Sequence, residues 1–357
     1  MQSASLRPKE SGAWRWQQRL VNAMLWPAGS RYSKIGSPKS VRSKSVSEPT
    51  SCDQAATYQQ FHKKGDGFIC PIVQSNGSGS GSRVRGVCPT RTWWTIQQLQ
   101  KKQSKGLATM IETTLDIPTA EGAMETFICR PERGDPCPAV YFLMDAPGIR
   151  DELCDMARRL ATSGYAVLLP NLYYRAGKHA PFGPDVLDKN SAEWSRMRAI
   201  RTKMTIPPVM NDVAAMLAYT DGQAWAQRGP VGVHGYCMSG PYALAAAARY
   251  PDRVAAAASF YGTWLVSDAV ESPHLTLAKT KGELYIACAE IDELAPPPMV
   301  EELQRLFKDS GARGELEIYP KVEHGFAFPL RHCFDKPAAE RHWERLLALY
   351  RRNLPGS

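Results

Sequence analysis

The pattern of hydrophobic and polar positions changes at Met110. From there to the end of the chain, short runs of β-branched and aromatic residues alternate with stretches that have a helical period. Seven of these runs are predicted strands, namely "ETFICRP", "AVYFLMDA", "YAVLLPNLYY", "PVGVHGYC", "VAAAASFYG", "GELYIACAEID" and "GELEIYP". Several are continuously apolar, which is typical of strands that are buried on both faces of a parallel sheet.

The stretches between these runs are predicted helices. They cover Asp151–Ser163, Val209–Thr220, Pro241–Arg249, Pro298–Asp309 and Pro337–Arg352. Alternation of strands and helices predicts an α/β domain over residues 110–357, with a mostly parallel sheet of about seven or eight strands and helices on both faces. In such sheets, functional side chains gather on the loops beyond the carboxyl ends of the strands.

Residues 1–109 lack this pattern and are rich in Ser, Gly and basic residues. They contain 17 Lys and Arg against 4 Asp and Glu, whereas the other 248 residues contain 27 basic and 31 acidic groups. Low apolar periodicity with high net charge predicts a disordered segment. Two other interpretations stay open for this segment. The start codon could be assigned too far upstream, or the segment could be an organelle-targeting presequence, which is typically rich in Arg and Ser and poor in acidic residues.

Composition narrows the class of protein. The chain is 43% hydrophobic and 22% charged, as ordinary soluble proteins are, and the net negative charge of residues 110–357 gives no support for nucleic-acid binding by that part. Nine cysteines with no C-x-x-C pair and no secretory signal favour a reducing, cytoplasmic compartment. The long uncharged run Gly229–Ala248 contains four glycines and two prolines, so we expect no membrane span there.

The segment "GYCMSG" carries the main chemical signal. A strand that ends at Tyr236 and a helix that begins near Met238 leave Cys237 on a sharp turn, where a nucleophile is held exposed above the sheet. A helix N-terminus favours a thiolate and offers the Met238 N–H to a developing oxyanion. A buried structural cysteine is the alternative interpretation of this motif, and Ser239 is a weaker candidate nucleophile.

A thiol nucleophile needs a base and a group that orients the base. In α/β-hydrolases these follow the nucleophile in the order acid, then histidine. Asp292 follows the predicted strand in "LYIACAEIDELAPP", and His324 follows the next one in "LEIYPKVEHGFAFP". Glu290 or Glu293 could replace Asp292 as the acid. Three suitable residue types in the expected order predict a Cys-His-Asp triad.

The chain from Met110 to Leu354 resembles the dienelactone hydrolase family, a cysteine-using branch of the α/β-hydrolases. The segments that carry the resemblance are "GYCMSG", "MDAPGIRDEL", "GYAVLLPNLYYR", "ASFYG", "AEIDELAPP" and "EHGFAFP". The resemblance implies the triad Cys237–His324–Asp292. It also implies a carboxylate near the thiol at Asp145, where the family usually has a glutamate, and a second oxyanion donor at the Ala146 N–H.

The resemblance also bears on the substrate. Family members hold a substrate carboxylate with arginines, one of which lies four residues after the catalytic histidine, where this chain has Phe328. Arg175 could still supply a positive charge. Other candidate substrate contacts are the aromatic residues Tyr173, Tyr174, Tyr261 and Trp264. Residues 176–204 could arch over the pocket, and together these assignments predict a preference for neutral substrates.

The predicted function is therefore hydrolysis of an ester, lactone or thioester through a covalent acyl-enzyme. This chemistry requires no metal or cofactor, and its partner is a small-molecule substrate; we expect a monomer or small homo-oligomer. The alternatives are a catalytically silent α/β-hydrolase scaffold that acts as a binding module, and a polyanion-binding or membrane-binding role for residues 1–109.

Overall fold

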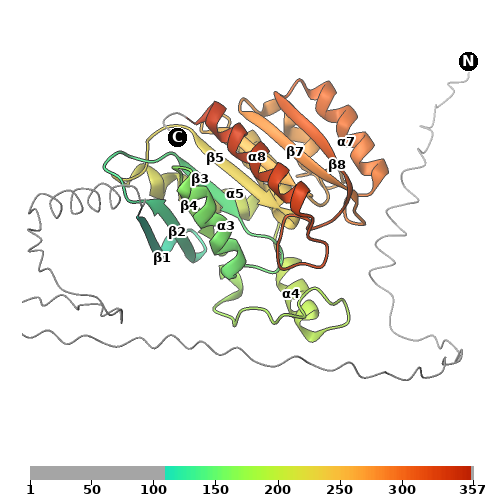
Figure 1. The fold of residues 1–357 in the computed structure, drawn as a ribbon, viewed down its shortest axis with the longest axis horizontal. Helices are drawn as coiled ribbons and strands as arrows, with labels where there is room; N and C mark the ends of the chain where they lie inside the picture. The colour runs from blue at the N-terminus through green and yellow to red at the C-terminus, as the bar shows by residue number, and fades with distance from the viewer. Residues whose placement is uncertain (1–108, 355–357) are drawn as a thin grey trace, which may run out of the picture. The chain divides into compact units, whose positions relative to one another are not determined.

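A computed structural model describes residues 109–354, and its centre is an eight-stranded sheet. The strands follow the order β1-β2-β4-β3-β5-β6-β7-β8 (Figure 1). They are β1 (Met110–Thr119), β2 (Gly122–Pro131), β3 (Ala139–Leu143), β4 (Ala166–Pro170), β5 (Val231–Tyr236), β6 (Val254–Phe260), β7 (Glu283–Ile291) and β8 (Gly314–Glu323). The pairs β1–β2 and β2–β4 are antiparallel, and the other pairs are parallel.

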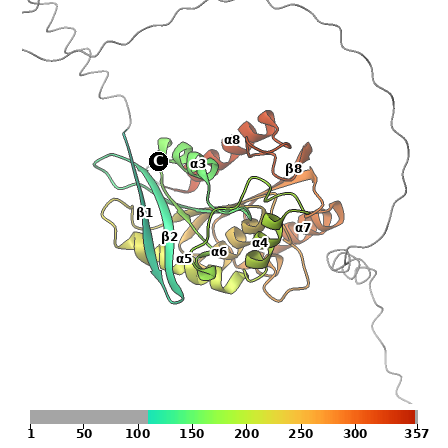
Figure 2. The ribbon, with the colours of Figure 1, turned by 90° about the horizontal axis from the view of Figure 1, so that it is seen from below.

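Helices cover both faces of this sheet. They are α3 (Asp151–Thr162), α4 (Ala192–Arg201), α5 (Ile206–Asp221), α6 (Gly240–Arg249), α7 (Pro297–Ser310) and α8 (Lys336–Asn353). Figure 2 shows α3 and α8 on one side of the sheet and α5, α6 and α7 on the other. Short 3₁₀ helices, η1 (Tyr174–Ala176), η2 (Cys237–Ser239) and η3 (Pro273–Lys279), lie in the connections.

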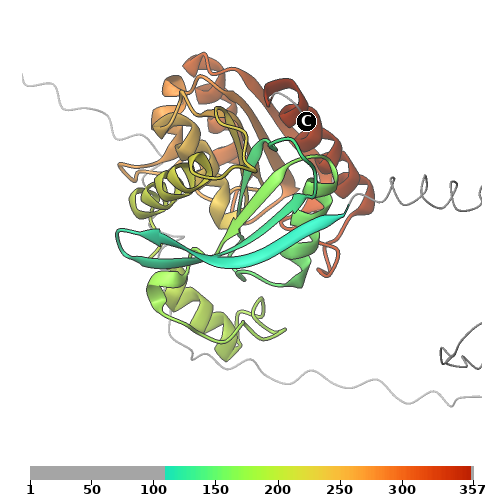
Figure 3. The ribbon, with the colours of Figure 1, turned by 90° about the vertical axis from the view of Figure 1, so that its left-hand side faces the viewer.

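The predicted fold class is confirmed. All seven predicted strands are present, and β3, β4 and β5 are buried along their whole length, as continuous apolar runs in a parallel sheet should be. The strand that sequence reasoning missed is β1. It forms the edge of the sheet beside β2 (Figure 3), and most of its residues are at least partly exposed, so it lacks an apolar run.

Local sequence explains where the helices begin. Asp151 and Glu152 occupy the first turn of α3, where the helix dipole favours negative charge. The Asp335 side chain accepts a hydrogen bond from the Ala338 N–H at 2.9 Å and caps α8. Ser191 caps α4 in the same way, by accepting a bond from the Trp194 N–H. Each of the five predicted helices is present within three residues of its expected ends.

The connection between η1 and α5 contains α4, and it lies outside the two helical layers at one end of the sheet (Figures 1 and 3). The four parallel strands β3, β5, β7 and β8 end near Asp145, Cys237, Asp292 and His324, respectively. Because the carboxyl ends of parallel strands meet at one edge of a sheet, this topology brings the four residues together.

The predictions for the basic N-terminal segment concern residues 1–109 and lie, except for Thr109, outside the described residues. Met110, where the change of pattern begins, is the first residue of β1. Within the described part of the chain, no helix combines the length and apolar character needed to cross a lipid bilayer.

Candidate active site

Cys237 lies on a strained turn between β5 and α6. Its φ of 54° is in the left-handed region that non-glycine residues rarely adopt. Tyr236 before it is extended, and a single 3₁₀ turn, rather than the expected immediate start of the α-helix, leads into α6 at Gly240. A strained residue of this kind between a strand and a helix is typical of a nucleophile elbow.

The turn closes only because its neighbours are small. A Cβ on Gly235 would lie 2.2 Å from the carbonyl oxygen of Ser239, and a Cβ on Gly240 would lie 2.5 Å from the Cα of Gly262. The Ser239 hydroxyl is buried and donates a hydrogen bond to the Met144 carbonyl. Ser239 is therefore committed to holding the turn, and Cys237 is the nucleophile candidate that the turn presents.

His324 and Asp292 form a hydrogen-bonded pair. The Nδ1 atom of His324 lies 2.7 Å from Oδ2 of Asp292, whose side chain is fully buried. The other oxygen of Asp292, Oδ1, accepts the Leu294 N–H at 2.8 Å, so both carboxylate oxygens are occupied. Among the described residues, the buried Nε2 atom of His324 has no hydrogen-bond partner.

Cys237 and His324 are electrostatically coupled. Burial of the thiol opposes ionisation, but the nearby charged His324 outweighs burial and lowers the pKa of Cys237. Burial likewise opposes the charged form of His324, yet the Cys237 charge and the bond to Asp292 raise the pKa of His324 to about 10. Both directions favour a thiolate–imidazolium pair.

The two alternative acids have other partners. The Glu290 carboxylate accepts the Lys321 N–H at 2.6 Å, and the exposed Glu293 forms an ion pair with Lys189 at 3.2 Å. The structure thus pairs Asp292, and neither glutamate, with the histidine.

Asp145 is fully buried between two arginines. Its carboxylate forms ion pairs with Arg150, at 2.6 Å, and with Arg331. Arg331 lowers the pKa of Cys237 after the larger effects of burial and His324, and the negative charge of Asp145 raises it. The short aspartate therefore acts on the thiol through its charge, and its oxygens are held by the two guanidinium groups.

The two expected oxyanion donors share a neighbour. The Tyr173 hydroxyl donates a hydrogen bond to the Ala146 carbonyl at 2.7 Å and lies 3.4 Å from the sulfur of Met238. Among the described residues, the Ala146 N–H donates no hydrogen bond. Tyr173 is only 1% exposed, so it supports the backbone of Ala146 and the side chain of Met238 and does not line an open pocket.

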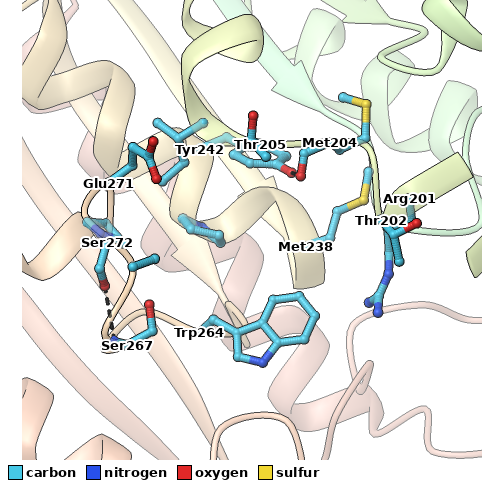
Figure 4. A pocket seen from close by; sticks show the side chains of 14 residues that line it. Arg201, Thr202, Met204, Thr205, Met238, Tyr242, Trp264, Ser267, Glu271 and Ser272 are labelled. Atoms are coloured by element: carbon cyan, nitrogen blue, oxygen red, sulfur yellow. Dashed lines mark hydrogen bonds between the residues drawn. The ribbon is translucent and has the colours of Figure 1, made fainter. Parts of the chain in front are cut away.

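A cavity of about 340 Å³ begins at Met238 (Figure 4). It is lined mainly by apolar and aromatic side chains, including Met204, Ile206, Met238, Pro241, Tyr242 and Trp264. Trp264 is 44% exposed and has a φ of 52°, so a second strained turn, after β6, presents this indole to the cavity. The cavity is a mainly apolar site next to the turn that carries Cys237, reached through the neighbouring residue Met238.

Two predicted substrate contacts are corrected by the structure. The Arg175 guanidinium is bound by Asp212 at 2.8 Å and by Glu121, so it is not a free cation at the pocket. Phe328 is fully buried, and the guanidinium groups of Arg150 and Arg331 stack on its ring. A phenylalanine therefore replaces the cation expected after His324 without lining the cavity.

Tyr261 is also fully buried, with its ring 5.0 Å from that of His324. The two rings meet edge to face, so Tyr261 packs against the histidine and restricts its position. Trp264 is thus the one member of the aromatic candidate set that lines the cavity at Met238.

Sequence reasoning missed Arg201 and Tyr242. Arg201 lies at the end of α4 with its guanidinium 5.0 Å from the centre of the Trp264 ring, and it forms no ion pair within the described residues. With Thr202 and Met204, it places the end of the 176–204 segment in the lining of this cavity. The neutral preference drawn from Phe328 and Arg175 loses its structural basis, because neither side chain lines this cavity while Arg201 does.

Residues 109–354 contain no cluster of three or more His, Cys, Asp or Glu side chains that could hold a metal ion. The residues gathered at the strand ends are instead those suited to acyl transfer: a thiol, an imidazole and carboxylates.

The mostly parallel sheet, helices on both faces and strained turn after β5 define an α/β-hydrolase. Residues 124–354 match the profile of the "Dienelactone hydrolase family", and the chain belongs to this family of hydrolases.

Known relatives span the same part of the chain. It is 25% identical over 246 residues to a "Putative carboxymethylenebutenolidase" of Methylorubrum extorquens, covering 68% of this chain and 81% of that protein. It is 26% identical to a "Probable 2-oxo-3-(5-oxofuran-2-ylidene)propanoate lactonase" of a Bradyrhizobium species, covering 68% and 94%. The crystal structure of a "Putative Dienelactone Hydrolase" from Klebsiella pneumoniae superposes with a TM-score of 0.60 at 22% identity, covering 68% and 99%.

Proposed function

We propose that this hydrolase cleaves an ester, lactone or thioester through a covalent acyl intermediate on Cys237. The observation that carries the proposal is the pairing of a thiol on a strained turn with the His324–Asp292 hydrogen bond. A nucleophile, a base within its electrostatic reach and a group that orients the base are the parts that acyl transfer needs.

The reaction begins with the proton of Cys237 on His324. The sulfur attacks the carbonyl carbon, a C–S bond forms, and the carbonyl oxygen becomes an oxyanion. The N–H groups of Met238 and Ala146 are the proposed donors to this oxyanion, and each such donor is typically worth about 3 kcal/mol. The oxyanion collapses, the bond to the leaving alcohol or thiol breaks, and His324 protonates the leaving group.

The second half of the reaction uses water. His324 takes a proton from a water molecule, the hydroxide attacks the acyl carbon, and the C–S bond breaks to release a carboxylic acid and the Cys237 thiolate. Asp292 fixes the ring orientation of His324 through both halves. Asp145, with Arg150 and Arg331, sets the charge around the sulfur.

The named relatives support a lactone or ester substrate, because one is described as a carboxymethylenebutenolidase and another as a lactonase. The cavity is consistent with neutral substrates, since its lining is mainly apolar, while Arg201 gives it one cation for an anionic group.

A panel of aryl esters, lactones and thioesters tests the proposal, with the wild type and Cys237→Ala assayed side by side. Alanine keeps the Cβ of cysteine, so the strain of the turn is unchanged, and equal melting temperatures serve as the folding control. We expect hydrolysis of at least one class by the wild type and none above background by Cys237→Ala. Equal rates above background in the two proteins would overturn the role of Cys237 as nucleophile. Binding without turnover of any class would favour a silent scaffold instead.

A further inference from the structure

A second cavity, of about 490 Å³, adjoins the cavity at Met238. The two share Ile206 and Glu271 in their linings. Figure 4 shows Glu271 across the first cavity from Met238 and Arg201, so the second cavity continues on the side away from the nucleophile. Together they form one trough, which we name the α6 trough.

Helix α6 forms the floor of this trough. Pro241 and Tyr242 line the first cavity, and Ala245, Ala248 and Arg249 line the second. Spacings of three, four and seven residues place these side chains on one face of a helix. The ten residues of α6 give the trough a length of about 15 Å.

The trough is deepest over the middle of α6, because the small side chains of Ala245 and Ala248 lie there between the larger Tyr242 and Arg249. Its walls carry further apolar groups. Ile206 and Met210 project from the first turns of α5, and Val270 belongs to the loop before η3. Val270 is 84% exposed, so this wall leaves an aliphatic side chain in water beside the trough. Apolar side chains therefore run along the floor and parts of both walls, and polar side chains complete the lining of the second cavity, namely Asn211, Arg249, Glu271, Thr276 and Lys279. An apolar strip of this kind that continues away from a nucleophile is suited to binding a chain.

We propose that the acyl group of the substrate is an extended apolar chain that lies in the α6 trough, from Cys237 towards Arg249. The proposal rests on the proposed function. It assigns the chain to the acyl side because this group stays attached to Cys237 until water releases it, whereas the leaving group departs. A compact lactone would occupy only the first cavity, and the second cavity would then have no part in binding.

Binding in the α6 trough predicts how kcat/KM should depend on the length of the acyl chain. Burial of one methylene group favours binding by about 0.8 kcal/mol, which corresponds to about a fourfold gain in kcat/KM when burial is complete, and an open trough that covers one side gives about twofold. The gain should continue with chain length past the first cavity and stop at the end of α6.

The test is a series of 4-nitrophenyl esters with acetyl, butyryl, octanoyl, dodecanoyl and hexadecanoyl chains, each kept below its critical micelle concentration. In Ala248→Trp, an indole fills the second cavity. Ala218→Trp is the matched control, because Ala218 is an exposed alanine on α5 that lines neither cavity. The readout is the ratio of kcat/KM for the dodecanoyl ester to that for the butyryl ester.

We expect this ratio to be large in the wild type and in Ala218→Trp, and at least about tenfold smaller in Ala248→Trp, since several methylenes lose their site. A flat series with Cys237-dependent hydrolysis of the acetyl ester would overturn the proposal and leave the proposed function intact. A chain-length gain that persists in Ala248→Trp would overturn the assignment to the trough. Absence of Cys237-dependent hydrolysis of these esters and of every lactone and thioester in the panel would overturn both.

Discussion

Replacement of Asp292 by asparagine should change the protonation of His324 in a direction that the structure fixes. In the wild type, Oδ1 of Asp292 accepts the Leu294 N–H at 2.8 Å, while Oδ2 faces Nδ1 of His324 at 2.7 Å. An asparagine keeps its oxygen on the Leu294 N–H, so its NH₂ group faces Nδ1. The ring must then carry its proton on Nε2, and this tautomer cannot take the proton of Cys237.

The magnitude follows from two separate losses. Removal of a charge-assisted hydrogen bond costs about 1.5–3 kcal/mol, or about 10- to 150-fold in kcat/KM. Imposing the wrong tautomer costs up to about 10⁴-fold. Asp292→Ala suffers only the first loss, because alanine cannot dictate the tautomer. We therefore expect asparagine to be more damaging than alanine, although it is the closer match in shape.

Steady-state kinetics on the best ester of the panel measures both variants, with far-UV circular dichroism and melting temperature as folding controls. A pH–rate profile adds a second readout, since loss of the Asp292 charge removes one of the groups that raise the pKa of His324. Values of kcat/KM within threefold of the wild type in both variants would refute this account of the His324–Asp292 pair. A lower kcat/KM in Asp292→Ala than in Asp292→Asn would refute it as well.

Three other changes have expected results. Burial lowers the pKa of His342 from 6.5 to about 4. Between about pH 6.5 and pH 4, this histidine is therefore protonated in the unfolded chain but neutral in the folded one. The free energy of unfolding should fall by up to about 3 kcal/mol as the pH is lowered through this range. Urea titrations at several pH values should show that the free energy of unfolding depends less on pH in His342→Gln than in the wild type. An identical pH dependence in the two proteins would contradict this. Asp145→Asn removes a charge that raises the pKa of Cys237, so alkylation by iodoacetamide should extend to lower pH; a shift to higher pH would oppose it. Gly235→Ala should lose its activity and about 3 kcal/mol of stability, because the added Cβ collides with Ser239. The control Gly134→Ala should lose neither, since nothing lies within 4 Å of its added Cβ. Equal melting temperatures of the two variants would count against the close-packed turn.

The residues at the strand ends were predictable because their signals are local. Cys237 and Asp292 follow largely apolar strands, and His324 follows the strand β8 with its alternating pattern. A parallel sheet brings the ends of these strands together. Strand β1 was not predictable in the same way. In this edge strand only Ile117 is well buried, so burial imposes little apolar pattern on its sequence, whereas the other edge strand, β8, keeps the recognisable alternation of "GELEIYP".

The substrate contacts depend on distant partners that no local pattern reveals. Arg175 is neutralised by Asp212, which lies 37 residues further along the chain. The Phe328 ring is covered by the guanidinium of Arg150, a residue far earlier in the chain. Arg201 reaches the cavity because Trp264, on another loop, holds its guanidinium there. Such pairings arise only in the folded structure, where charge and burial are set by tertiary contacts.

The central claim is that Cys237 forms a covalent bond with the substrate. Rapid quenching of the reaction with an aryl ester, followed by intact-protein and peptide mass spectrometry, measures this bond directly. We expect an adduct with the mass of the acyl group on the peptide that contains Cys237, formed in the pre-steady state and absent in Cys237→Ala. Hydrolysis that proceeds at the wild-type rate in Cys237→Ala, with no acyl adduct on the wild-type cysteine, would contradict the account.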